Sequence, residues 1–128
     1  MRLLLDTHAF LWWVLDDSRL SKRVDGLFRD PANELLMSVA SGWEIAIKAG
    51  LGRIELPEPP STFIPDQIRR NDMAVLDITM HHALEVYSLP PHHGDPFDRI
   101  LIAQGLTERI PIVTRDPVFS NYEIETVW

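Results

Sequence analysis

The chain has 128 residues, and a hydrophobic share of 45% is typical of one globular domain with a hydrophobic core. It contains no cysteine, which excludes disulfides, a thiolate nucleophile and a cysteine-based zinc site. Its apolar runs are too short to span a bilayer, and a net charge of −7 argues against an extended basic surface for nucleic acid. We therefore expect a single domain over residues 1–128, in the cytoplasm and without a membrane contact.

The first half of the chain alternates apolar runs with helical patterns. The run at residues 3–5 predicts a buried strand, and Thr7 opens a helix that extends to about Leu15. A second helix follows Ser21, and residues 34–39 predict a second strand. We expect Ser41 to cap a third helix that ends near Gly50.

The second half continues this alternation. A proline-rich loop at residues 57–60 precedes a predicted helix at 61–70, a strand at 73–78 and a helix at 80–88. Asp95 and Pro96 are a strong helix start, with the aspartate as N-cap. From this helix we expect four apolar side chains to point inward: Ile100, Leu101, Ala103 and Leu106. Residues 112–114 predict a buried strand and residues 122–127 a terminal edge strand.

Strands that alternate with helices predict an α/β fold of three layers, in which helices cover both faces of a mostly parallel sheet. Ligands of such sheets bind beyond the carboxyl ends of the strands. This edge of the predicted sheet is therefore the place to look for functional residues.

Four acidic residues from separate segments fall at this edge. Asp6 ends the first strand, and Asp116 follows the strand at 112–114. Glu44 and Asp98 each lie in the first turn of a predicted helix. We take these four residues as the candidate catalytic and metal-binding site.

Each acid also has a simpler explanation. Ser41 and Glu44 match a capping box, Asp98 has the same position relative to Asp95, and Asp6 and Asp116 suit a helix cap and a turn. A cap contributes only ~1 kcal/mol. Two carboxylates about 5 Å apart repel each other by ~3 kcal/mol at an effective dielectric near 20. If the four acids converge, a divalent cation is needed to offset that repulsion.

Ligand chemistry favours one or two Mg²⁺ or Mn²⁺ ions, because carboxylate oxygens select hard cations. Such ions at a cluster of carboxylates suit the hydrolysis of phosphodiesters. The polar neighbours Thr7, Ser41 and Thr114 fit supporting roles, either holding an acid or orienting water.

The cationic neighbours are less distinctive. Lys48 lies four residues after Glu44, which predicts a surface ion pair, although a contact with substrate stays open. Arg99 and Arg115 flank two of the acids, where they either meet substrate phosphates or are merely exposed.

Histidine and tryptophan pairs also stand out. The pairs at 81–82 and 92–93 have poor spacing for one metal ion, but His93 is placed to hold the loop before the Asp98 helix. Trp12 and Trp13 are adjacent on the first helix, so we expect one in the core and the other exposed at a partner surface or making a second core contact.

The motifs together resemble those of VapC-type toxin ribonucleases, within the PIN-domain superfamily. The resemblance runs nearly end to end and rests on five blocks: residues 3–8 (LLLDTH), 41–45 (SGWEI) with Lys48, 89–99 (LPPHHGDPFDR), 101–104 (LIAQ) and 113–116 (VTRD). Two positions depart from the family pattern. Gly105 stands where an alanine is usual, at a cost of ~1 kcal/mol within a helix, and Arg115 stands where small residues are common.

This resemblance implies a PIN-like domain that acts as an Mg²⁺- or Mn²⁺-dependent endoribonuclease. It implies that Asp6, Glu44, Asp98 and Asp116 form the metal pocket, with Asp6 and Asp98 as direct ligands. It also implies a small antitoxin protein whose tail blocks the acidic pocket, and a homodimer. The acidic composition favours a small structured RNA that is recognised by shape and few contacts.

Two other functions stay open. A receiver-like or phosphatase-like domain would use Asp6 as a phosphorylated residue, but would want a second acid at position 8, which is His8. An inactive PIN domain that serves only as a protein partner would bind metal without cleaving RNA.

Overall fold

The structure is a computed structural model that describes residues 1–128. Its single sheet has the strand order β3-β2-β1-β4-β5, and every neighbouring pair is parallel. The strands are β1 (Arg2–Leu5), β2 (Glu34–Ser38), β3 (Ala74–Leu76), β4 (Ile112–Val113) and β5 (Thr126–Val127). The helices are α1 (Thr7–Val14), α2 (Lys22–Arg29), α3 (Val39–Gly50), α4 (Pro60–Arg70), α5 (Met80–Glu85) and α6 (Pro96–Glu108), with the short 3₁₀ helices η1 (Val86–Ser88) and η2 (Pro117–Asn121).

Strand β1 occupies the centre of the sheet. Leu4 is paired with Leu36 of β2 on one side and with Ile112 of β4 on the other. Because a central parallel strand is covered on both faces, it reads as a continuous apolar run, as the sequence LLL predicted.

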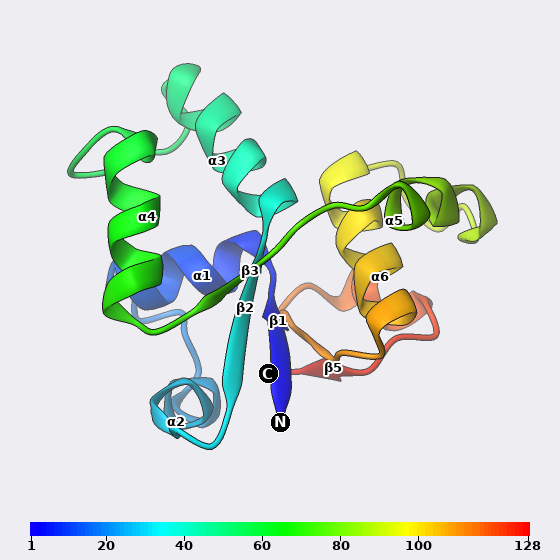
Figure 1. Ribbon diagram of the computed structural model, residues 1–128, viewed down its shortest axis with the longest axis horizontal. Coiled ribbons are helices and arrows are strands. Elements are labelled where there is room, and N and C mark those ends of the chain that lie inside the picture. Colours follow the sequence, from blue (N-terminus) through cyan, green and yellow to red (C-terminus); the bar gives the residue numbers. More distant parts are fainter.

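The helices form two layers, one on each face of the sheet (Figure 1). Leu3 and Leu5 pack on the side of α1, α2 and α4, whereas Leu4 packs against α6 on the opposite side. Helix α3 leaves the carboxyl edge of the sheet and contacts α1, α4 and α6. The prediction of a three-layer α/β fold with a parallel sheet is confirmed.

The start of α3 differs from the prediction. The helix begins at Val39, and its N-cap is Ser38, whose Oγ accepts from the Ala40 amide at 3.0 Å. The predicted cap at Ser41 is wrong, and Ser41 is buried inside the helix. Glu44 consequently lies in the second turn, so its predicted part in a capping box is also wrong.

Other elements also differ in extent. The terminal edge strand, predicted over 122–127, is limited to Thr126–Val127. Helix α6 begins at Pro96 as predicted, with Asp95 accepting from the amides of Phe97 and Asp98. Of its four predicted inward residues, Leu101 and Ala103 are buried, while Ile100 and Leu106 are only half-buried. No helix has the length and apolar character needed to cross a bilayer.

Candidate functional site

The carboxyl edge of the sheet collects the predicted acids. Asp6 directly follows β1 and caps α1, with its Oδ1 accepting from the Ala9 amide at 2.7 Å. Asp116 follows β4 and caps η2 by accepting from the Val118 amide at 3.0 Å. Asp6 thus has the expected capping role, Asp116 caps η2 where a turn was expected, and both acids lie at the expected edge.

The other two acids come from helices. Glu44 projects from α3 and is 4% exposed, which is unusual for a carboxylate. Asp98 lies in the first turn of α6, where its amide donates to Asp95 at 3.2 Å. A carboxylate in a first helical turn is stabilised by the positive end of the helix dipole.

Buried hydroxyls hold two of the acids. Thr7 Oγ1 donates to Glu44 Oε1 at 2.6 Å and lies 3.1 Å from the Ser41 hydroxyl, which joins α1 to α3. The Thr114 side chain hydrogen-bonds to Asp6, and its oxygen accepts from the Asp116 amide at 3.1 Å. Thr7 and Thr114 thus contact acids of the site directly, whereas Ser41 contacts Thr7.

In the protein without a bound metal ion, the charged forms of two carboxyl groups are disfavoured. Burial raises the pKa of Asp6, against the lowering effect of its hydrogen bonds with Thr114 and Ala9, and the negative charge of Asp116 raises it further. Burial, followed by the charge of Asp95, raises the pKa of Asp98 to about 6, and Glu44 contributes in the same direction. Neither carboxylate forms an ion pair with lysine or arginine.

The acids are arranged as two pairs rather than as one cluster. Asp6 and Asp116 line one hollow of about 340 Å³, whereas Glu44 and Asp98 repel each other across the α3–α6 contact. No three His, Asp or Glu side chains stand close enough together to hold a metal ion. The donor chemistry nevertheless suits a hard cation, because every candidate ligand is a carboxylate and two are destabilised by burial.

The predicted cationic residues have separate environments. Lys48 pairs with Glu44 as expected, but the carboxylate of this pair is buried instead of lying on the surface. The Arg99 guanidinium donates to four backbone carbonyls, which belong to Val86, Leu89, Pro90 and His93. Arg115 is exposed at the rim of the hollow.

A tyrosine that the sequence analysis did not identify connects several of these residues. The Tyr122 hydroxyl lies 2.7 Å from His93 Nδ1 and accepts from Arg99 at 3.1 Å. His93 Nε2 in turn lies 3.2 Å from Asp98 Oδ2. The expected role of His93 in the loop before α6 is confirmed, but no local pattern in the sequence marks Tyr122 as its partner.

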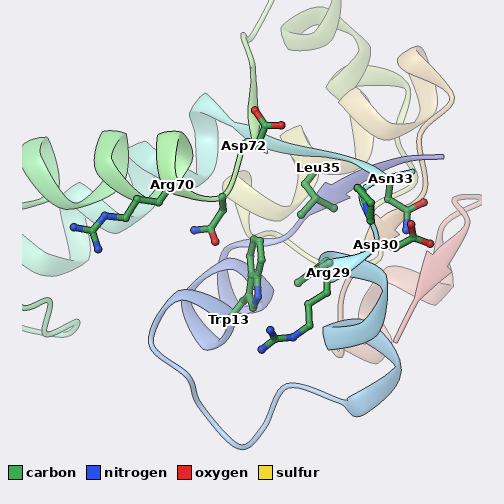
Figure 2. Close-up of a pocket in the computed structure, with 10 residues that line it drawn as sticks. Trp13, Arg29, Asp30, Asn33, Leu35, Arg70 and Asp72 are labelled. Atoms are coloured by element: carbon green, nitrogen blue, oxygen red, sulfur yellow. The ribbon is translucent and has the colours of Figure 1, made fainter.

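A cavity larger than the hollow at Asp6 and Asp116 lies elsewhere in the molecule. It measures about 570 Å³ and contains Trp13, Leu35 and polar residues that include Arg29, Arg70 and Asp72 (Figure 2). None of the four acids lines it. Cavity size alone therefore does not identify the candidate site.

Comparison with known proteins identifies related sequences and folds. A model of the PIN domain matches residues 3–125. Ribonuclease VapC22 of Mycobacterium tuberculosis is 31% identical over 114 residues, which cover 88% of this chain and 85% of that protein. Ribonuclease VapC16 of the same organism is 39% identical over 56 residues, a match that spans 44% of this chain but only 40% of the relative.

The fold has a close structural counterpart. The crystal structure of VapBC2 from Rickettsia felis, bound to a DNA fragment from their promoter, matches with a TM-score of 0.74. The match covers 100% of this chain and 99% of the other at 13% sequence identity, so it supports the fold alone.

Proposed function

This chain belongs to the PIN-domain family, with VapC-type ribonucleases among its relatives, and from this we infer that it is a metal-dependent endoribonuclease. One structural observation supports the proposal most directly. Acids from four separate segments lie at the carboxyl edge of the sheet, and burial disfavours the charged forms of Asp6 and Asp98. A hard divalent cation would stabilise both as carboxylates.

The four acids would together hold one or two Mg²⁺ or Mn²⁺ ions. We assign Asp6 and Asp98 as direct ligands, with Glu44 and Asp116 completing the site. When bound, such an ion acidifies a water molecule and neutralises the charge that develops on the phosphate.

The supporting hydroxyls act on the acids. Thr7 and Ser41 fix the Glu44 side chain within α3, and Thr114 fixes Asp6 against the end of β4. Because these hydroxyls are buried, the carboxylates are oriented before substrate arrives. The charge of Lys48 offsets the repulsion between Glu44 and Asp98. The contacts of Arg99 favour a role in holding the loop before α6.

The proposed substrate is RNA, which this acidic chain would recognise by shape and few contacts. A net charge of −7 makes bound cations important, since they reverse the local potential where a phosphate must approach. Cytoplasmic location and inhibition by a small antitoxin that covers the acidic pocket belong to the same proposal.

A homodimer is the assembly that we propose. Four exposed apolar side chains follow one face of α3 at intervals of four residues: Val39, Trp43, Ile47 and Leu51. Met80 and Leu84 of α5 are exposed as well, at 73% and 67%. Such a face is costly to leave in water, and the VapC-type resemblance indicates a second copy of the chain as its occupant.

Cleavage of RNA tests the proposed site. Wild-type protein should cut a labelled oligoribonucleotide with Mn²⁺ and lose this activity with a chelator, and Asp98→Asn should lose it with the ion present. Asp72→Asn makes the same chemical change at an exposed residue outside the site, so it should cleave as wild type does. Equal cleavage by wild type and Asp98→Asn would reject the assigned site.

One alternative has an observation in its favour. No three His, Asp or Glu side chains stand close enough together to hold a metal ion, which would suit an inactive PIN domain that serves only as a protein partner. Binding of Mn²⁺ by calorimetry without any RNA cleavage would favour that function. The PIN-domain match leaves the receiver-like alternative unsupported.

A further inference from the structure

The hollow beside Asp6 and Asp116 contains a second kind of chemistry. Its remaining walls combine two aromatic rings with two guanidinium groups, contributed by His8, Trp12, Arg19 and Arg115. The hollow has a volume of about 340 Å³ and opens directly onto the two acids. Any molecule that reaches these acids from this side therefore contacts the aromatic and cationic wall.

Trp12 is the centre of this wall. Its ring lies 5.7 Å from the His8 ring and meets Trp128 edge-on, also at 5.7 Å. The neighbouring Trp13 turns instead to Phe28, at 4.8 Å, and to the core. Both tryptophans are half-buried: Trp13 packs against the core, as expected of one of the pair, while Trp12 lines the hollow instead of being fully exposed.

The two guanidinium groups differ in whether they are free to bind an anion. Arg19 lies over the Trp12 ring at 4.8 Å and is held by both oxygens of Asp17, at 3.0 and 2.8 Å. Arg115 lies 5.9 Å from the same ring, is exposed and forms no ion pair. Arg115 is thus the cation of this hollow that remains free to meet an anion.

We infer, on the premise of the proposed function, that this hollow is an RNA subsite for the nucleotide next to the scissile phosphate. Its base stacks on the Trp12–His8 wall, and a backbone phosphate meets Arg115. Aromatic rings and guanidinium planes are the usual stacking surfaces for unpaired bases, and they tolerate any base because every base has a π-face. This subsite explains how an acidic chain retains RNA with few contacts.

Steady-state cleavage of a labelled single-stranded oligoribonucleotide with Mn²⁺ tests the subsite. Because one base–aromatic stack is worth about tenfold or more in affinity, Trp12→Leu should raise KM by about that factor, with kcat within about twofold. Arg115→Gln should reduce the slope of log(kcat/KM) against log[salt] by about 0.7, the value for one lost phosphate contact to a single strand.

A matched control removes one charge elsewhere. Arg109 lies between α6 and β4, at the opposite end of β4 from Arg115, so Arg109→Gln should leave KM and the salt slope unchanged. Thermal unfolding of every variant separates a lost contact from a lost fold. Arg115 is exposed and makes no hydrogen bond in the structure, so its variant keeps the test valid even if Trp12→Leu fails to fold.

Binding measured without turnover separates this inference from the proposed function. In an Asp98→Asn background, fluorescence anisotropy of the same RNA should show about tenfold weaker binding when Trp12→Leu is added. If wild type cleaves no RNA but this binding difference is present, the enzyme proposal fails and the subsite stands. If the background does not bind RNA, or if the Trp12 and Arg115 variants match the Arg109 control, the subsite is overturned and a protein segment becomes the better occupant.

Discussion

In the folded chain, the carboxyl group of Asp98 binds its proton more tightly than an exposed aspartate does. Burial and the charges of Asp95 and Glu44 raise its pKa to about 6, whereas an aspartate in an unfolded chain titrates near a pKa of ~3.9. The folded state therefore binds this proton more tightly. The contribution of Asp98 to the free energy of unfolding is fully favourable below a pH of ~4 and is lost as the pH rises through about 6.

Asp98→Asn should therefore stabilise the metal-free protein at neutral pH. A neutral amide avoids the cost of a buried charge, so we expect the free energy of unfolding to rise by about 1–3 kcal/mol at pH 7, with no gain below a pH of ~4. Denaturant unfolding of both proteins across this pH range, in a chelator, measures the difference. A gain that does not depend on pH would contradict the raised pKa of Asp98.

The Tyr122 hydroxyl gives a second prediction, on the stability of the loop before α6. It contacts both His93 and Arg99, so Tyr122→Phe leaves two partners without their bond while it keeps the buried ring. We expect a loss of about 1–2 kcal/mol in the free energy of unfolding. Tyr87→Phe is the matched control, because the Tyr87 side chain is 95% exposed. Equal stability of the two variants would show that the hydroxyl does not hold the loop.

Single residues also show where prediction from sequence stops. The approximate positions of Asp6, Asp98 and Asp116 could be predicted because each follows a strand or lies in the first turn of a helix, whereas Glu44 lies one turn further into α3 than expected. The contacts of Arg99 could not be predicted, because its carbonyl partners lie 6 to 13 residues away in η1 and in the loop that follows it. Likewise, the contact between Thr7 and Glu44 joins residues 37 positions apart, and no local pattern encodes it.

Helix boundaries depended on which of several similar signals the fold uses. Asp95 and Pro96 left one choice for the start of α6, and the structure has that start. Ser41 was the expected cap of α3, but Ser38 caps the helix because its backbone is still extended at the end of β2. Ser41 was the poorer candidate, since the buried run of β2 ends before it and its hydroxyl contacts Thr7.

Gly105 in α6 yields a prediction for that helix. An added Cβ would lie 3.1 Å from the Ile110 carbonyl oxygen and 3.0 and 3.2 Å from the side chains of Ile124 and Ile112. The helix would gain ~1 kcal/mol from alanine, but overpacking of this kind costs about 1–3 kcal/mol. Glycine is therefore explained by the close approach of α6 to the chain that precedes β4.

We expect Gly105→Ala to lower the free energy of unfolding by about 1 kcal/mol, and Gly105→Val to lower it further. Chemical denaturation measures both. Gly50→Ala is the control, because nothing lies within 4 Å of the added carbon there. A stabilised Gly105→Ala protein would show that the two isoleucine side chains and the loop adjust freely.

At the scale of the molecule, alternating strands and helices were enough to predict the parallel sheet and the edge that carries the acids. They were not enough to predict that the acids form two pairs, because side-chain positions depend on the packing of α3 against α6. The aromatic wall at Trp12 could not be predicted from the sequence either, because the Trp12 ring contacts Trp128, 116 positions away.

The proposed homodimer gives the prediction for the whole assembly. Trp43 is 60% exposed on α3 and stacks edge-on against Phe97, so Trp43→Glu places a charge in the centre of the proposed interface. We expect this variant to be monomeric at concentrations where the wild type sediments as a dimer. Leu15→Glu, at an exposed apolar residue after α1, should remain dimeric. A monomeric wild type in the same experiment would exclude this interface.

The position of β4 beside the central strand β1 has a consequence for synthesis on the ribosome. Strand β1 emerges well before β4, yet the partner of Leu4 is Ile112 of β4, and Asp116 is translated later still. A nascent chain that has reached α6 still has an unpaired edge along β1 and lacks one of its four acids. The acidic site thus cannot be completed before β4 and Asp116 are made, so a product that terminates before Asp116 would lack it.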